Sequence, residues 1–204
     1  MNKDLQFNKI IIFINGLIPL TLMLWDAYHQ KLGANPQEFL IHTTGSCALI
    51  FLTITLSITP LRKITKWHNL TRYRRMLGLF AFFYAFLHFL SYAWLTKFFD
   101  IAKIISDVLK RQYIAVGMVA FVILILLAIT SANRMVKQLG GQRWRKLHRF
   151  AYHATILGAI HYWMSVKIDT SRPLIFMVLI LVLLGYRYFT ARSETSSLFK
   201  PSRG

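Results

Sequence analysis

Six long apolar segments separated by short polar ones dominate the sequence. They run over Ile10–Trp25, Ile41–Leu61, Met76–Leu95, Tyr113–Ala132, Phe150–Val166 and Pro173–Phe189. Apolar residues fill these segments in blocks, with no helical stripe and no strict alternation, which argues against surface helices and half-buried strands. A helix that crosses a bilayer needs roughly 17 to 25 such residues, and an isolated strand cannot satisfy its backbone in lipid. The pattern therefore predicts an all-α integral membrane bundle of six transmembrane helices.

The polar segments between the spans are too short to form a second domain. We expect one six-helix transmembrane domain over residues 1–192 and a mobile cytoplasmic tail over residues 193–204. Neither a dinucleotide-binding glycine motif nor a P-loop occurs in the sequence. Any chemistry must therefore take place inside the bundle or on its short loops.

The charge distribution predicts the orientation of the bundle. The chain of 204 residues has 25 Lys and Arg against 7 Asp and Glu, a net charge of +18. In a soluble protein this excess would suggest nucleic-acid binding. Here the alternate polar segments place 18 of the basic residues on one side of the bundle and 7 on the other. Because cytoplasmic loops are enriched in Lys and Arg, we expect both termini to be cytoplasmic and no nucleic-acid partner.

Two histidines lie at matching depths in the predicted spans. His88 is in the third span and His161 in the fifth, and these two spans run in the same direction. At 1.5 Å per residue, both lie about 18 to 20 Å from the cytoplasmic face. Two neutral imidazoles at one level of neighbouring helices can serve as the axial ligands of a haem. The alternative is a pair of buried histidines bonded to backbone or hydroxyl groups.

Two further histidines have more than one interpretation. His148 lies roughly 140° around a straight helix and about 20 Å along it from His161, so the two cannot bind one iron. His148 either ligates a second haem near the cytoplasmic face or is an interfacial side chain, and Arg74 and Arg75 occupy its level on the third span. His42, near the outer end of the second span, has a structural role or bonds a haem propionate.

Three groups of residues form a more specific pattern than the histidine spacing. They are Thr59-Pro60-Leu61-Arg62, Arg74-Arg75-Met76-Leu77-Gly78-Leu79 with Tyr84 and His88, and Trp144-Arg145-Lys146-Leu147-His148-Arg149 with Tyr152 and His161. Together they resemble the MsrQ (YedZ) family, within the ferric-reductase-like transmembrane group. Members of this family are the haem-binding membrane subunits of the bacterial periplasmic methionine sulfoxide reductase system. The likeness covers essentially the whole chain.

The resemblance implies a b-type cytochrome of the bacterial inner membrane with one or two haem b groups. It implies an electron-transfer subunit, with no catalytic residue of its own. Electrons would come from the quinone pool or a flavin reductase and pass to the periplasmic molybdopterin subunit MsrP, which reduces methionine sulfoxide in oxidised periplasmic proteins. The family's haem ligands fall on His88, His148 and His161 here.

The resemblance also implies FMN, although these residues do not locate its site. Four arginines near the cytoplasmic face are candidates for binding haem propionates or a flavin phosphate, with plain anchoring as the alternative: Arg74, Arg75, Arg145 and Arg149.

Two other functions remain open from the residues alone. One is a small membrane transporter or channel with a histidine proton relay, and the other is an assembly subunit without a cofactor. Acidic residues inside the spans would favour a relay, and the spans contain none.

Overall fold

The computed structural model describes residues 3–198, and over that range it contains helices and no strand. In chain order the elements are α1 (Lys3–Tyr28), α2 (Pro36–Thr65), the 3₁₀ turn η1 (His68–Arg72), α3 (Arg74–Ser91), the π-helical segment η2 (Tyr92–Thr96), α4 (Ile101–Lys110), α5 (Gln112–Ile129), α6 (Asn133–Leu147), α7 (Phe150–Ser165) and α8 (Ser171–Leu198).

Five helices are long and apolar enough to cross a membrane: α1, α2, α3 together with η2, α5, and Ser171–Thr190 of α8. The fifth predicted span corresponds to α7, which has 16 residues, or about 24 Å at 1.5 Å per residue. The all-α membrane fold is therefore confirmed, whereas the count of six transmembrane helices stays a prediction. Helix α8 continues through residues 193–198 of the predicted tail, and residues 199–204 lie outside the described part of the chain.

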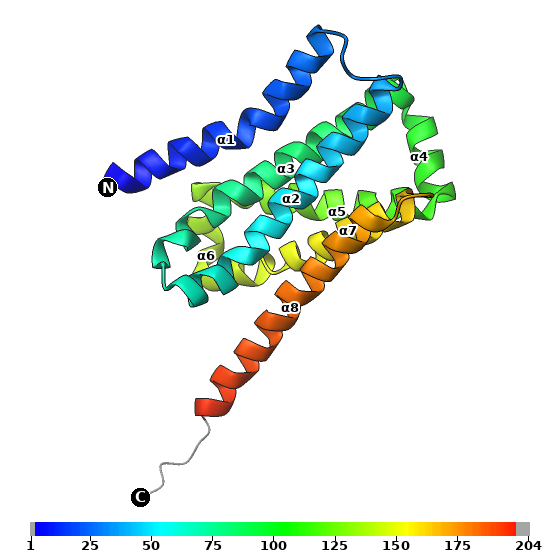
Figure 1. Cartoon of the computed structure of the whole chain (residues 1–204). Coiled ribbons are helices and arrows are strands. Elements are labelled where there is room, and N and C mark those ends of the chain that lie inside the picture. Colours follow the sequence, from blue (N-terminus) through cyan, green and yellow to red (C-terminus); the bar gives the residue numbers. More distant parts are fainter. Residues whose placement is uncertain (1–2, 199–204) are drawn as a thin grey trace, which may run out of the picture.

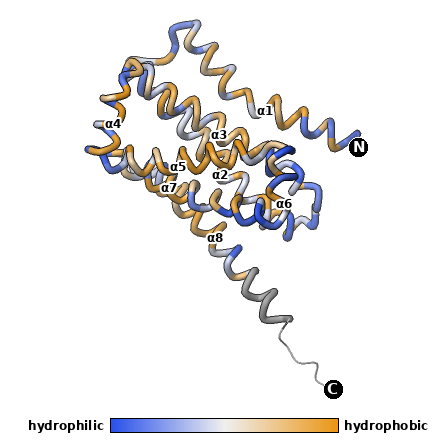
Figure 2. The backbone as a smooth tube through the Cα atoms, turned by 180° about the vertical axis from the view of Figure 1, so that it is seen from behind, coloured by the Kyte–Doolittle hydropathy of each residue, from blue (hydrophilic) through white to orange (hydrophobic). Residues whose placement is uncertain are grey.

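The chain runs back and forth between two ends of the bundle (Figure 1). The start of α1, η1, α6 and the far part of α8 lie towards one end, which we call the α6 end. Helix α4 and the connections from α1 to α2 and from α7 to α8 lie towards the other, the α4 end. Figure 2 shows α6 as hydrophilic and α5 as hydrophobic. This alternation places the two most basic connections, 62–75 and 134–149, at the α6 end. The side of the membrane that each end faces stays a prediction.

Helix α2 is the centre of the packing. It contacts α3, α7 and α8, and 44% of its apolar window is buried, against 11% in α1 and in α8. Helix α5 packs against α3 and α7. The four helices α2, α3, α5 and α7 thus enclose the interior of the bundle, while α1 and α8 leave most of their apolar surface for lipid.

Helix α1 is fastened to this group through α3. The Tyr84 hydroxyl, fully buried, donates a hydrogen bond of 2.6 Å to the carbonyl of Gly16. The ring of Phe80 occupies the space where a side chain at Gly16 would lie, at 2.5 Å from an added Cβ. A glycine at this position therefore allows α1 and α3 to approach each other closely.

The polar segments on either side of α5 also form helices. The Asp100 side chain caps α4 by accepting a hydrogen bond of 3.1 Å from the backbone N–H of Lys103. Helix α6 is interrupted at Gly140, where φ is 71° and the chain kinks. Both segments are polar or amphipathic connections between spans, so hydropathy does not distinguish them from loops.

Candidate functional site

A cavity of about 380 Å³ lies between α2, α3, α5 and α7, within the size range of protein sites for small ligands and cofactors. His88 and His161 both line it, and it extends to the α4 end, where Lys97, Asp107 and Arg111 also line it. Much of the remaining wall is apolar and includes Ala48, Leu49, Leu52, Ala85, Phe89, Phe121 and Leu124.

The structure brings His88 and His161 together, as their depths predict. The centres of the two imidazole rings are 5.9 Å apart. Nδ1 of His88 is 2.9 Å from the carbonyl oxygen of Ile41, and Nδ1 of His161 is 2.7 Å from that of Tyr113. Because a carbonyl only accepts, each Nδ1 carries the proton, and each neutral ring presents the lone pair of Nε2.

This arrangement fits axial ligation of a haem iron. Metal–imidazole bonds are about 2 Å long, so two rings on opposite sides of one metal have centres about 6 Å apart. The observed separation is 5.9 Å. A metal-bound histidine typically donates its other ring N–H to a carbonyl or carboxylate, which fixes the tautomer and the ring orientation. His88 and His161 both have this support in place.

Two glycines give the imidazoles their room. A Cβ added at Gly117 of α5 would lie 2.7 Å from Nδ1 of His161, and one added at Gly45 of α2 would lie 3.0 Å from Nδ1 of His88. Each histidine therefore lies against the bare backbone of the neighbouring helix. This close approach allows Nδ1 of each ring to donate a hydrogen bond to a backbone carbonyl of that helix.

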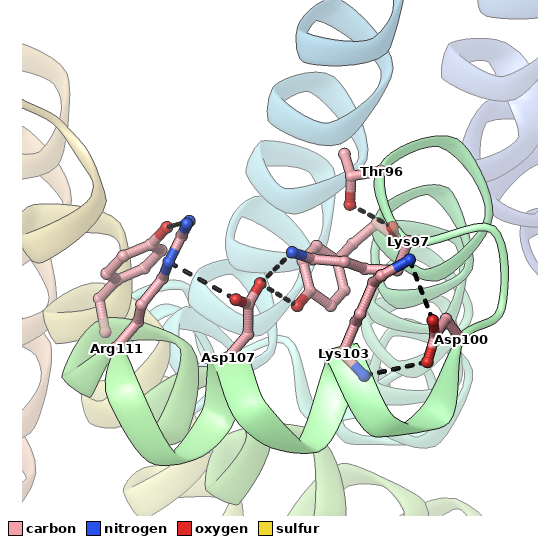
Figure 3. Close-up of polar contacts among 8 residues, drawn as sticks. Thr96, Lys97, Asp100, Lys103, Asp107 and Arg111 are labelled. Atoms are coloured by element: carbon pink, nitrogen blue, oxygen red, sulfur yellow. Dashed lines mark hydrogen bonds and ion pairs between the residues drawn. The ribbon is translucent and has the colours of Figure 1, made fainter.

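A cluster of charged and hydroxyl side chains lies at the α4 end of the cavity (Figure 3). We call Tyr92, Lys97, Asp107, Arg111 and Tyr113 the Asp107 cluster. Oδ2 of Asp107 accepts from Nζ of Lys97 at 2.5 Å and from the hydroxyl of Tyr92 at 2.8 Å. Oδ1 of Asp107 lies 3.6 Å from Nε of Arg111. The hydrogen bonds from Lys97 and Tyr92 hold the pKa of Asp107 below its usual value.

His148 lies outside the cavity lining, in surroundings of another kind. Its ring stacks on Trp144 at 4.0 Å between centres. Nε2 is 3.3 Å from the hydroxyl of Thr130, which itself donates to the carbonyl of Leu126. Burial and the charge of Arg75 lower the pKa of His148. In contrast to His88 and His161, Nε2 of His148 therefore lies next to a hydroxyl group.

The four candidate arginines have different environments. Arg75 donates a hydrogen bond of 2.6 Å to Asn133 of α6, while Arg145 and Arg149 are exposed. Arg74 is partly buried and donates to the hydroxyl of Thr59 on α2. The structure therefore separates Arg74, which faces α2, from Arg75, which faces α6.

Arg187 of α8 was missed by the sequence reasoning. It donates to the hydroxyl of Thr59 at 2.6 Å, to the carbonyl of Leu56 at 3.0 Å and to the hydroxyl of Tyr152. The same Thr59 hydroxyl thus accepts from Arg74 and from Arg187. A signal existed, because Arg187 is the single charged residue of its apolar segment and ionisable residues within spans are rare and usually partnered.

Comparison with known proteins places the chain in a family. Residues 44–159 match the family described as "Ferric reductase like transmembrane component". The chain is 49% identical over 200 residues to the "Protein-methionine-sulfoxide reductase heme-binding subunit MsrQ" of Herminiimonas arsenicoxydans, a match that covers 96% of this chain and 92% of that protein. The chain belongs to the MsrQ family. The MsrQ protein of Rhodospirillum rubrum is 44% identical over 197 residues, covering 97% and 95% of the two chains.

Membership of the MsrQ family confirms the resemblance given by the motifs. The related MsrQ proteins are named as haem-binding subunits. In this member of the family, a largely apolar cavity contains two imidazoles with ring centres 5.9 Å apart, an arrangement that fits a haem. The Asp107 cluster and the two glycines beside the histidines were not among the residues predicted from sequence.

Proposed function

We propose that this protein is the electron-transfer subunit of a methionine sulfoxide reductase system, with one haem b between His88 and His161. The observation that carries the proposal is the pair of rings 5.9 Å apart, each with Nδ1 bonded to a backbone carbonyl. A haem supplies a one-electron carrier. His88 and His161 would hold this haem, which would then supply electron transfer in preference to catalysis.

The protein's own residues hold and insulate the carrier. The carbonyls of Ile41 and Tyr113 fix the two imidazoles, and much of the surrounding cavity wall is apolar. His88 lies near the end of α3 and His161 near the end of α7, both towards the α4 end. With that end facing the periplasm, electrons would leave there for the catalytic subunit MsrP and support repair of oxidised periplasmic proteins.

Electrons would enter at the α6 end, on the cytoplasmic side of the inner membrane. The donor would be the quinone pool or a flavin reductase, and FMN would be a second cofactor of this side. The exposed guanidinium groups of Arg145 and Arg149 support binding of an anionic partner there, because guanidinium pairs well with phosphate and carboxylate.

His148 enters this proposal as a residue of the α6 end. A second haem ligated through its Nε2 would displace the contact with Thr130 and would need its other ligand from a residue other than His88 or His161. We therefore propose a single bis-histidine haem per chain. A haem count near two would instead give His148 a haem of its own.

The test is a reduced-minus-oxidised visible spectrum of the detergent-purified protein, with haem counted per chain as the pyridine haemochrome. We expect sharp b-type bands and about one haem per chain, lost in His88→Ala and His161→Ala and retained in His148→Ala. Full absorbance in either of the first two variants would overturn the proposed ligand pair. A colourless protein from cells supplied with haem would overturn the cytochrome interpretation and favour a transporter.

A further inference from the structure

The Asp107 cluster places two cationic side chains at one end of an otherwise largely apolar cavity. Lys97 and Arg111 are the only lysine and arginine among the described residues that line it. The Lys97 side chain is 17% exposed and that of Asp107 is 13% exposed, so this pair is largely withdrawn from solvent. Arg111 is half-exposed.

A single carboxylate does not balance these two cations. Asp107 accepts from Lys97 at 2.5 Å and lies 3.6 Å from Arg111, so the three side chains together carry one positive charge in excess. The Lys97–Asp107 pair is largely buried, whereas Arg111 is half-exposed, so the excess charge is a cation at the α4 end of the cavity that can bind an anion. The ligand that fits the cavity therefore has an anionic end directed towards α4.

Haem has this distribution of charge, because its macrocycle is apolar and its two propionates are carboxylates on one edge. We propose that Lys97 and Arg111 bind the propionates of the haem held by His88 and His161, and that Asp107 is the positioning residue for both cations. This inference rests on the proposed function. It gives the cavity a polar end and thereby sets the orientation of the haem.

The cluster is also connected to one of the proposed ligands. Nη1 of Arg111 lies 3.4 Å from the hydroxyl of Tyr113, and the backbone carbonyl of Tyr113 accepts from Nδ1 of His161 at 2.7 Å. Arg111 is the single residue between α4 and α5. Arg111 would hold a propionate, and Tyr113, two residues further along the chain, orients the proposed iron ligand His161. One chain segment would therefore position both the propionate and the ligand.

Helix α4 offers a matched control for the cation variants. Lys103 pairs with Asp100 at 3.0 Å (Figure 3), its side chain is 70% exposed, and it is not among the lining residues. Replacing Lys103 with Gln removes one positive charge, as each test variant does, at a position of α4 that lies between Lys97 and Arg111 in the chain. It leaves the cavity and the Asp107 cluster unchanged.

The experiment compares Lys97→Gln, Arg111→Gln and Lys103→Gln in the purified holoprotein. We expect the first two to keep the bis-histidine spectrum, to release haem to apomyoglobin about tenfold faster and to have a lower midpoint potential. The potential falls because a nearby cation stabilises the reduced, more negative state. Lys103→Gln is expected to match the unaltered protein, and Lys97→Arg to restore most of the retention.

A second measurement is independent of how well any single variant folds. The unaltered apoprotein is titrated with haem and with haem dimethyl ester, whose propionates carry no charge. We expect at least tenfold weaker binding of the ester, and nearly equal binding of the two in the double variant Lys97→Gln with Arg111→Gln. Equal binding of the two by the unaltered protein would overturn the inference.

The outcomes also separate this inference from the proposed function. If His88→Ala and His161→Ala keep their haem, the proposed function fails first. If those two variants lose haem while Lys97→Gln and Arg111→Gln behave as Lys103→Gln does, the haem site stands and the assignment of the propionates is wrong.

Discussion

Gly45 and Gly117 let two helix backbones lie against imidazole rings at distances that a side chain would not permit. The added Cβ at Gly117 would be 2.7 Å from His161 Nδ1, whereas the contact at Gly45 would be 3.0 Å. In both cases Nδ1 of the ring also donates a hydrogen bond to a carbonyl of the same helix, that of Ile41 or Tyr113. A ring fixed in this way cannot move aside without weakening the hydrogen bond that orients it.

Gly117→Ala is therefore expected to impair haem binding more than Gly45→Ala. Overpacking of this kind costs about 1 to 3 kcal/mol, and here the cost falls on His161. The matched control is Gly78→Ala on α3, where an added Cβ would meet nothing within 4 Å. Haem per chain and its rate of loss to apomyoglobin are the measurements. Equal haem retention in the Gly117 and Gly78 variants would show that His161 tolerates the contact.

Thr59 is a second residue on which several groups depend, because its hydroxyl accepts from both Arg74 and Arg187. Thr59→Val keeps the shape and removes the acceptor. A hydrogen bond to a charged group contributes about 1.5 to 3 kcal/mol, so we expect a clearly lower unfolding temperature in detergent. Thr59→Ser is expected to stay close to the unaltered protein. Indistinguishable melting of the Val and Ser variants would show that the shared acceptor contributes little.

At the scale of single residues, the sequence predicts as functional those with ionisable side chains inside an apolar span. His88 and His161 are conspicuous because their depths match. Gly45 and Gly117 are small residues in apolar helices, and only the register of one helix against another shows that a ring needs their space. That register depends on packing across the bundle and cannot be obtained from the spacing along one helix.

Helix α4 combines two faces with different roles. Its apolar residues Ile101, Ile105 and Leu109 are exposed, which is typical of a helix lying at the membrane surface. Its Asp107 side chain instead turns to the cavity and pairs with Lys97 (Figure 3). The helix therefore lies at the α4 end of the cavity, while its apolar face remains available to lipid.

The pairing of Asp107 makes this cover dependent on pH. Hydrogen bonds from Lys97 and Tyr92 lower the pKa of Asp107 in the folded protein. A lowered pKa means that the contribution to stability is present above the unfolded value of about 4 and is lost as the pH falls through the folded value. The groups that face Asp107 are Lys97, Arg111 and Tyr92.

We therefore expect Asp107→Asn to release haem faster than the unaltered protein at pH 6 to 7, where the carboxylate is charged. The difference between the two proteins should shrink as the pH falls below about 4. Comparing the two rates at each pH removes the effects of pH that the two proteins share. Asp100→Asn is the control, because Asp100 pairs with Lys103 outside the cavity. A difference that stays constant with pH would contradict a charged role for Asp107.

For the whole molecule, hydropathy predicts the crossings but not what connects them. The long apolar segments of α1, α2, α3, α5 and α8 are visible in the sequence because lipid permits little else. Helices α4 and α6 lie in segments that hydropathy predicts as loops. Helix α4 is short and amphipathic, and α6 is polar and kinked at Gly140, so neither forms a continuous apolar segment. The shortness of α7 is why the number of crossings cannot be read from length alone.

The side of the membrane that each end faces determines how the proposed electron transfer would be oriented. Lys103 at the α4 end and Arg143 at the α6 end are both exposed, and the single native cysteine, Cys47, is buried. Lys103→Cys and Arg143→Cys thus each add one accessible thiol to a protein whose own thiol is shielded. With cytoplasmic termini, a membrane-impermeant maleimide labels Lys103→Cys in intact spheroplasts. Arg143→Cys is labelled only after the membrane is opened, and the unaltered protein stays unlabelled.

The reverse labelling pattern would contradict more than the orientation. His88 and His161 lie towards the α4 end, so an inverted bundle would place the proposed haem near the cytoplasm. Electrons leaving the proposed His88–His161 haem would then have to travel most of the length of the bundle to reach a periplasmic acceptor. A positive result instead places the Asp107 cluster at the periplasmic surface, on the face where the catalytic subunit would dock.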